Sequence, residues 1–315
     1  MKIIDFEDVQ SLSINPIEFY KWAEEAWFYK KEALMPPKSK ILQENSGRYI
    51  CMPCVIPSLD TAGVKYICRN MDDVNGLPKR NSNIMVQRIS KPGLEAVIDG
   101  IYITNMRTGA VAVENVKLFA KENFKSLGLM GLGIAARAFF LIFCEVFKDR
   151  EIEVKLYRYK DQAEIFIERF SMVKNIHFSI VDTYEDICSC DVIVSCISNA
   201  TSTLCSDDVF KEGCTVVPVH TRGFQNCDLF FDKVFVDDIG HVKDFKYFDK
   251  FKNLTEVSDV VTGVAPGRTN DNERIIAYCG GIALHDLYFA RKIIDYINDN
   301  AIDIPMRLPN ARFWI

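Results

Sequence analysis

The stretch S-L-G-L-M-G-L-G-I-A-A, residues 126–136, constrains the fold of this chain more than any other. A short apolar run ends in G-x-G-x-x-A and passes directly into a helix-prone sequence. This order is typical of the strand, glycine turn and helix start of a dinucleotide-binding βαβ unit, whose backbone N–H groups hold a pyrophosphate. We therefore predict that Gly131, Gly133, Ile134 and Ala135 bind a nucleotide cofactor. A glycine turn that binds nothing is the alternative.

The residues that follow this turn favour nucleotide binding over a turn that binds nothing. Strand patterns and helix patterns alternate, which is typical of a parallel sheet covered by helices. The expected strands are residues 153–157, 176–181, 191–196, 215–219 and 233–237, with a helix at 161–170. The glycine turn then lies at the first strand-to-helix connection, where a nucleotide-binding fold requires it.

The residues before the turn have a different pattern. A capped helix is expected from Asn15-Pro16 to about Ala33, with its apolar stripe in a core or a subunit interface. Apolar and polar residues then alternate up to Thr104, which predicts a mostly antiparallel sheet. A helix should begin at Arg107, and the last long helix, 283–297, could close either domain.

Composition limits the kinds of ligand that are expected and the compartment in which the protein is expected to reside. The chain has 315 residues, 49% of them hydrophobic, and a net charge of -5 with scattered lysines and arginines. These values predict a globular protein with a small-molecule ligand, and no nucleic acid or membrane partner. The N-terminus lacks the apolar core of a signal peptide, and no apolar run reaches the roughly 18 residues of a membrane span. We predict a cytoplasmic location.

Cysteine and histidine usage argues against a metal centre. The 11 cysteines are odd in number and most lie in apolar runs, so we expect buried free thiols. Cys51 and Cys54 have the C-x-x-C spacing of a redox or zinc pair, but no second pair follows. The four histidines are far apart in sequence, and we predict no metal.

Several local motifs occur in a familiar order along nearly the whole chain. They are M-P-P-K-S-K-I at 35–41, C-M-P at 51–53, G-V-K at 63–65, T-N-M-R-T-G-A at 104–110, the glycine turn, G-V-A-P-G-R at 263–268 and C-G-G-I-A-L-H-D-L at 279–287. Together they resemble the ornithine cyclodeaminase/mu-crystallin family. The resemblance implies an α/β fold, in which a Rossmann-like dinucleotide-binding domain (119–281) is inserted in a discontinuous α+β substrate-binding and dimerisation domain (1–118 and 282–315). It also implies a homodimer.

The resemblance assigns roles to individual residues. Arg107 matches the arginine that binds the substrate carboxylate, as a bidentate donor at a helix start. Lys65 matches the lysine near the reacting carbon, where it could hold a carboxylate or deliver a proton. Lys38 and Met52 fall in the substrate-side motifs, and Gly281 falls on the cofactor side. The alternatives are an exposed or salt-bridged arginine at position 107, a solvated strand lysine at position 65 and a surface lysine at position 38.

One departure from the family pattern bears on the reaction. Cyclodeaminases place a catalytic aspartate after the fifth strand, where this chain has Thr221 beside His220 and Arg222. A hydroxyl does not replace a carboxylate as general base without an activating partner. The resemblance then favours an imine reductase or an amino-acid or opine-type dehydrogenase, with Thr221 in the site and Arg222 or His220 as a second anion contact. A structural role for Arg222 or His220 is the alternative. A cyclodeaminase that uses other groups, or a non-catalytic NADPH-binding protein, are the alternatives.

The end of the second expected strand bears on the cofactor. An acidic residue usually binds the ribose of NAD here, whereas this chain has Tyr157-Arg158. An arginine without an acidic neighbour favours a 2′-phosphate, so we predict NADPH, with NADH possible. Ser198 and Asn199, after the fourth strand, should line the nicotinamide side of the crevice.

Overall fold

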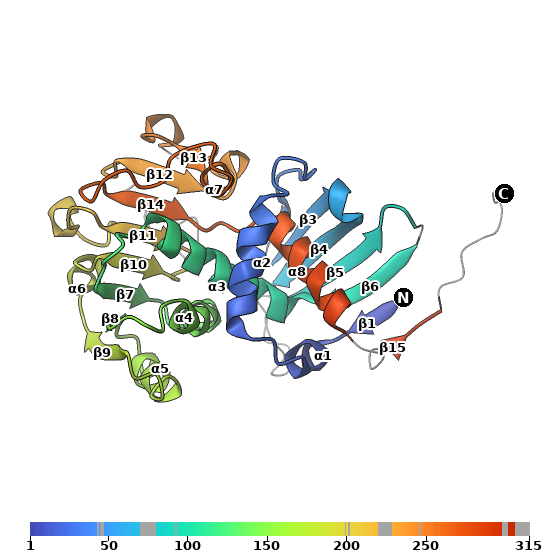
Figure 1. The fold of residues 1–315 in the computed structure, drawn as a ribbon, viewed down its shortest axis with the longest axis horizontal. Coiled ribbons are helices and arrows are strands. Elements are labelled where there is room, and N and C mark those ends of the chain that lie inside the picture. The colour runs from blue at the N-terminus through green and yellow to red at the C-terminus, as the bar shows by residue number, and fades with distance from the viewer. Residues whose placement is uncertain are drawn as a thin grey trace. The chain divides into compact units, whose positions relative to one another are not determined.

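The computed structural model divides into two compact units (Figure 1). Unit 1 comprises Met1–Asn15, Tyr29–Thr104 and Ile282–Ile315, and unit 2 comprises Pro16–Phe28 and Asn105–Gly281. Within them, the structure describes residues 1–42, 44, 47–69, 80–91, 93–198, 200, 202–219, 229–245, 247–297 and 302–305.

Unit 2 is built on a parallel 8-stranded sheet in the order β13-β12-β14-β11-β10-β7-β8-β9. The strands are β7 (Ser126–Met130), β8 (Ile152–Tyr157), β9 (Ile176–Val181), β10 (Val192–Ser195), β11 (Thr215–Pro218), β12 (Lys233–Val236), β13 (Thr255–Glu256) and β14 (Ile275–Tyr278). The predicted strands and their parallel pairing are confirmed. Chain order reverses between β7 and β10, and ligands of such sheets bind outside the carboxyl ends of the strands at this point.

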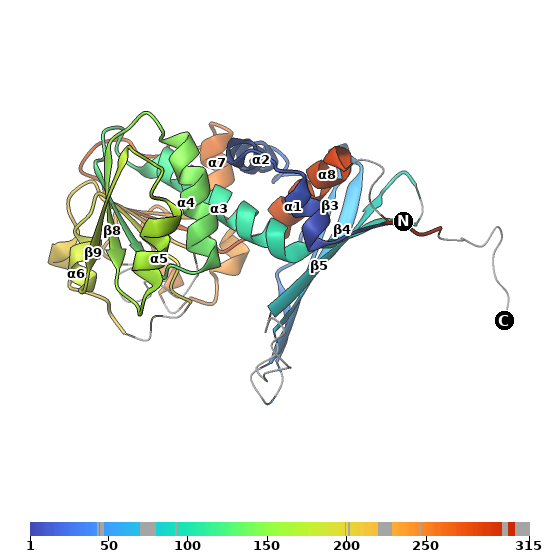
Figure 2. The same ribbon diagram turned by 90° about the horizontal axis from the view of Figure 1, so that it is seen from below.

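The helices of unit 2 pack against this sheet or against one another (Figure 2). They are α2 (Pro16–Trp27), most of α3 (Gly100–Phe119), α4 (Ile134–Val146), α5 (Gln162–Arg169), α6 (Tyr184–Cys188) and α7 (Val257–Val261). The predicted stripe of α2 is a core stripe, because Phe19, Trp22 and Trp27 are buried and α2 packs against α4 and α7. The helix ends at Trp27, short of the predicted end at Ala33. Burial of this stripe places residues 16–28 in unit 2, whereas the predicted boundaries assign them to the first domain.

The start of α3 differs from the prediction. Strand β6 (Leu94–Asp99) ends five residues before Thr104, and α3 begins directly after it at Gly100. Asp99 Oδ1 accepts a hydrogen bond of 2.8 Å from the Ile101 N–H, which favours a helix start here. Arg107 therefore lies inside a helix and not at its first turn, so the predicted contribution of a helix N-terminus to anion binding at Arg107 is wrong.

Unit 1 contains a 7-stranded sheet in the order β15-β1-β6-β5-β4-β3-β2. Besides β6, the strands are β1 (Lys2–Ile4), β2 (Ser39–Leu42), β3 (Arg48–Ile56), β4 (Thr61–Arg69), β5 (Arg80–Arg88) and β15 (Ile302–Asp303). Strands β2 to β6 pair in antiparallel fashion, as predicted. Helix α1 (Phe6–Ser11) follows β1, and α8 (Ala283–Tyr296) lies across β3, β4 and β5 (Figures 1 and 2). The last long helix thus closes unit 1.

Close packing of α8 on the sheet depends on Gly63. A Cβ atom built at Gly63 would overlap the Met85 carbonyl and lie 2.6 Å from Leu287 Cδ1, so a larger residue would push the helix away. Residues that alternate along β3 face α8 or the opposite side of the sheet. Cys51 and Cys54 consequently lie on opposite faces, a geometry that does not suit a redox or zinc pair. The ten cysteines in the described ranges are free thiols.

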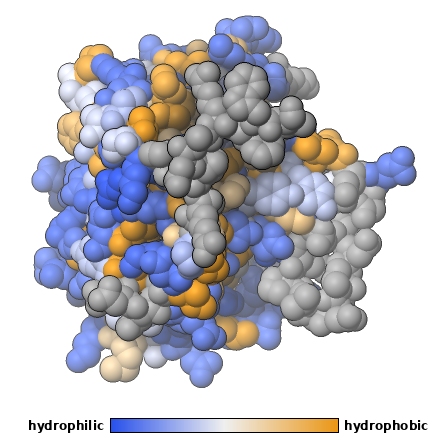
Figure 3. Space-filling model, turned by 90° about the vertical axis from the view of Figure 1, so that its right-hand side faces the viewer, coloured by the Kyte–Doolittle hydropathy of each residue, from blue (hydrophilic) through white to orange (hydrophobic). Residues whose placement is uncertain are grey.

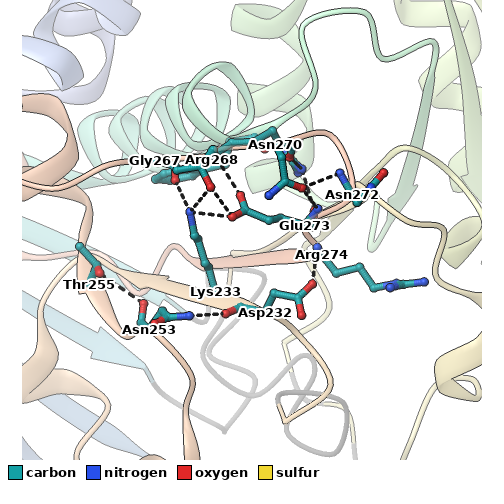
Figure 4. Close-up of polar contacts among 12 residues, drawn as sticks. Asp232, Lys233, Asn253, Thr255, Gly267, Arg268, Asn270, Asn272, Glu273 and Arg274 are labelled. Carbon is teal, nitrogen blue, oxygen red and sulfur yellow. Dashed lines mark hydrogen bonds and ion pairs between the residues drawn. The ribbon is translucent and has the colours of Figure 1, made fainter.

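The arginine of the P-G-R motif has a structural role in unit 2. Arg268 donates to the backbone carbonyls of Phe119, Gly213 and Glu273 at 2.8, 3.0 and 2.7 Å. Beside it, Lys233 Nζ lies 2.9 Å from Glu273 Oε1 (Figure 4). Burial disfavours the Glu273 carboxylate, but hydrogen bonds from Thr269 and Lys233 outweigh it and lower the pKa of Glu273 to about 2. This network fixes the segment that leads into β14.

On the side shown in Figure 3, hydrophobic and hydrophilic residues of the described part of the chain lie side by side. Of the helices in the described part of the chain, none is both long and apolar enough to cross a membrane.

Candidate functional site

The glycine turn has the geometry that a pyrophosphate requires. Gly131 has a φ of +77°, and a Cβ there would lie 2.6 Å from the Cys196 carbonyl carbon. Gly133 is the N-cap of α4, has no side-chain cap, and would place a Cβ in open space with no atom within 4 Å. Ile134 is exposed and Ala135 is half-buried. The first N–H groups of α4 are thus open for an anion.

The neighbouring strand ends beside this turn. The Cys196 N–H donates to the Met130 carbonyl at 2.8 Å, which joins the segment after β10 to the end of β7. Ser198 follows and is exposed, on the carboxyl side of the sheet where the nicotinamide end of a nucleotide is expected. Asn199, its predicted partner in this role, lies outside the described residues.

The end of β8 corrects one premise of the cofactor prediction. Arg158 has no acidic neighbour in sequence, but its Nε lies 2.8 Å from Asp182 Oδ1 and its Nη1 lies 2.6 Å from Glu164 Oε1. The hydrogen bond with Asp182, followed by the other contacts of these carboxylates, raises the pKa of Arg158. Tyr157 stacks on Tyr184 at 4.3 Å. A 2′-phosphate would have to compete with two carboxylates for this guanidinium.

Arg107, which the sequence predicts to bind the substrate carboxylate, is part of unit 2. Its side chain is buried and packs over Gly281. Gly281 follows β14 with a φ of +73°, and a Cβ at this position would overlap the Arg107 guanidinium. The Gly281 N–H donates to Asp237 Oδ2 at 2.5 Å, which fixes the backbone under the arginine. The exposed alternative for Arg107 is excluded, because only 6% of its surface is accessible. The predicted contact of Gly281 with a cofactor stays a prediction.

Two carboxylates near Arg107 and Gly281 were not predicted from the sequence. Asp237 is buried at the end of β12, and Glu114 is buried on α3, where it accepts a 2.7 Å hydrogen bond from Trp27 Nε1. Burial above all, and then the charges of Glu24 and Asp237, raises the pKa of Glu114 well above its usual value. An acidic residue directly after the apolar run V-F-V was the available signal for Asp237.

In unit 1, Lys65 is fully buried on the face of β4 that α8 covers. Its Nζ lies 2.5 Å from Asp286 Oδ2, and neither side chain is accessible to solvent. Met52, also buried, is its cross-strand neighbour on β3. The solvated alternative for Lys65 is therefore excluded. Lys38 precedes β2 and is half-buried. Sequence reasoning missed Asp286, although it stands in the quoted motif H-D-L.

Besides Asn199, two further predicted site residues are not among the residues that the structure describes. Thr221 and Arg222 lie outside the described residues, as does His220. Within the described ranges, no group of three or more histidine, cysteine, aspartate or glutamate side chains is arranged to hold a metal ion.

Comparison with known proteins gives consistent matches. The model of the ornithine cyclodeaminase/mu-crystallin family matches residues 5–301. The nodulation efficiency protein NfeD of Rhizobium meliloti is 26% identical over 269 residues, which cover 82% of this chain and 83% of that protein. A Δ1-pyrroline-2-carboxylate reductase of Bacillus thuringiensis is 25% identical over 276 residues (81% and 82%). An archaeal alanine dehydrogenase dimer with bound NAD has a TM-score of 0.82, at 24% identity and with 94% and 95% of the two chains covered.

Replacement of Gly281 by alanine tests the packing of Arg107. Gly281→Ala should lower the free energy of unfolding more than Gly263→Ala, by about 1–2 kcal/mol, because it must also displace the guanidinium. Gly263 is a matched control, since it has the same φ of +73° but open space at its Cβ position. Urea unfolding of both variants measures the difference. Equal losses of unfolding free energy in the two variants would show that the packing of Arg107 does not depend on Gly281.

Proposed function

Because the chain belongs to the ornithine cyclodeaminase/mu-crystallin family, we propose that it is an NAD(P)H-dependent reductase or dehydrogenase. It acts on the C=N or CH–NH bond of a small imino or α-amino acid. The observation that carries this proposal is the open glycine turn at the point where strand order reverses, because that geometry suits a dinucleotide. A relative named as a Δ1-pyrroline-2-carboxylate reductase and a structural neighbour named as an alanine dehydrogenase support the reaction class.

The nucleotide is assigned to unit 2. Gly131, Gly133 and the first N–H groups of α4 hold its pyrophosphate, and Ser198 borders its nicotinamide. When bound, the nicotinamide supplies or accepts a hydride. Hydride transfer of this kind therefore needs no metal, and the chain has to provide only binding, orientation and charge.

The substrate carboxylate is assigned to Arg107. A buried guanidinium presents paired donors that match a planar carboxylate, and burial strengthens that interaction. Lys65 positions the substrate near its reacting carbon, with Met52 and Lys38 as further substrate contacts. Arg222 is kept as a second anion contact and Thr221 as a residue beside the reacting group.

The choice of hydride transfer over deamination with ring closure rests on Thr221. Deamination with ring closure needs a general base at this position, and threonine is not one at neutral pH. Hydride transfer between a nicotinamide and an imine carbon makes no such demand. The specific imino or amino acid stays open, and a cytoplasmic location stays a prediction.

We propose that the protein forms a homodimer through the sheet of unit 1. The sheet face opposite α8 carries Tyr49, Pro53, Val55, Val64 and Tyr66, which are half-buried, and Met85, which is exposed. Tyr49 and Tyr66 stack on this face at 6.0 Å. An apolar face of this kind suits burial against a second copy, and the alanine dehydrogenase neighbour is named as a dimer.

Charge on that face should break the dimer. Tyr66→Lys is expected to convert the protein to a monomer, because an ammonium would be buried without a counter-ion. Met172→Lys is the control, since Met172 is a highly exposed apolar residue of unit 2. Sedimentation equilibrium of both variants and of the original protein measures the mass. A dimeric Tyr66→Lys, or a monomeric original protein, would contradict the assembly.

Turnover of an imine tests the function directly. The purified chain should oxidise NADPH or NADH when Δ1-pyrroline-2-carboxylate, or pyruvate with ammonium, is added. Arg107→Ala should lower kcat/KM by about 100-fold, since a charged hydrogen-bonded contact is lost. Arg169→Ala, at the exposed end of α5, should not. Ammonia release from ornithine without net oxidation would indicate a cyclodeaminase, and nucleotide binding without turnover would indicate a binding protein.

Arg158 tests the preference for NADPH. If it binds the 2′-phosphate, Arg158→Ala should raise the Kd of NADPH about 10-fold and that of NADH by less than about 3-fold. Fluorescence titration with both nucleotides measures the two constants, with Arg169→Ala as the control. Equal changes would mean that Arg158 serves only to pair Asp182 and Glu164.

A further inference from the structure

The carboxylate opposite Lys65 has no role in the function described so far. We propose that Asp286 is a positioning residue that holds Lys65 as a fixed ammonium, so that Lys65 serves the reaction as a permanent positive charge and not as a proton carrier. This inference rests on the proposed function and decides between the two roles that the sequence left open for Lys65.

The pair is held by the packing of unit 1. Lys65 is on β4, inside the sheet, and Asp286 is in the first turn of α8, which crosses that strand. Gly63, two residues before Lys65 on the same face, allows α8 to approach closely through Leu287. The distance of 2.5 Å between Nζ and Oδ2 is therefore set by backbone elements and not by two flexible surface chains.

The charges of the pair follow from burial. An isolated ammonium in an apolar interior loses its proton, whereas one beside a carboxylate keeps it. The carboxylate in turn lies in the first turn of a 14-residue helix, where the helix dipole favours negative charge. Both effects favour Lys65 ammonium with Asp286 carboxylate over the neutral pair.

The other groups around Lys65 do not take over this role. From β3, the Cys54 thiol faces the same side, and its burial, together with the Asp286 charge, raises its pKa to about 12. It is therefore neutral. The buried residues of β5, namely Ser82, Ile84 and Val86, have no ionisable side chain. On α8, His285 precedes Asp286 and is buried, but its imidazole provides no carboxylate for Lys65.

Further along α8, the charged groups bind one another. Arg291 lies 2.7 Å from Glu95 on β6 and 3.0 Å from Asp295 one turn later. Among the described ion pairs of unit 1, Asp286 is thus the carboxylate that contacts Lys65.

A fixed charge is sufficient for imine reduction. A protonated imine already carries its proton on nitrogen, so hydride addition at carbon moves the C=N electron pair to nitrogen and yields the CH–NH product. The step balances without a proton from Lys65. The ammonium instead attracts the anionic substrate and orients it.

The charge state of Lys65 can be measured without turnover. In protein labelled with ¹³C at lysine Cε, and with the Lys65 signal assigned by its loss in Lys65→Arg, the signal should stay at the ammonium position between about pH 6 and 9. In Asp286→Asn it should move to the neutral-amine position within that range. Asp295→Asn, the same substitution on the same helix, should leave it unchanged.

Kinetics with Δ1-pyrroline-2-carboxylate provide the second readout. In Asp286→Asn, kcat/KM should fall at least about 10-fold relative to the original protein as pH rises from about 7 to 9, because Lys65 loses its charge. Asp286→Glu should restore most of the original profile. An unchanged signal and profile in a folded Asp286→Asn, or titration of Lys65 in the original protein, would overturn the proposal. If Asp286→Asn does not fold, the original protein's spectrum decides. Absence of turnover with every substrate would refute the proposed function instead, whatever the spectrum shows.

Discussion

Burial of positive charge is the constraint on which the rest of this structure depends. Transfer of an ammonium or guanidinium out of water costs several kcal/mol unless a partner compensates for the loss. Unit 1 compensates Lys65 with Asp286, and does so by docking a whole helix against the sheet. The helix can come close enough only because Gly63 has no side chain. Gly63 and the docking of α8 together therefore create the buried site of this ion pair.

Unit 2 uses glycines in a different way. At Gly131 and Gly281 the backbone adopts a positive φ, so that a tight turn and a flat surface are formed where a side chain would intrude. The first position leaves helix N–H groups open, and the second leaves space for Arg107. Asp237 fixes the second position from below through the backbone. The two glycines thus shape the turn before α4 and the surface under Arg107 without contributing a side chain.

Sequence patterns predicted the parallel sheet well because its strands are short apolar runs separated by helix patterns with clear periodicity. The same reasoning failed at α3, because residues 100–106 include the β-branched and aromatic residues of a strand, while the capping by Asp99 that starts the helix is a local contact. The family resemblance singled out Lys65 and Arg107, but the sequence did not show that both are buried. Asp286 and Asp237 were not predicted, because each is far away in the chain from the residue that it contacts, Lys65 and Gly281 respectively. The pairing of Arg158 was also missed, because neither Asp182 nor Glu164 is adjacent to it in the sequence.

The position of α8 in the chain has a consequence for synthesis. The strands that it covers, β3 to β5, emerge from the ribosome about 200 residues earlier than the helix, because the whole of the parallel sheet lies between them. Until α8 arrives, the sheet of unit 1 exposes an apolar face with an uncompensated lysine in its middle. The nucleotide-binding unit can complete its sheet before that point. Translation therefore favours an order in which the inserted unit folds first, and the surrounding unit is stable only when the last part of the chain has been made.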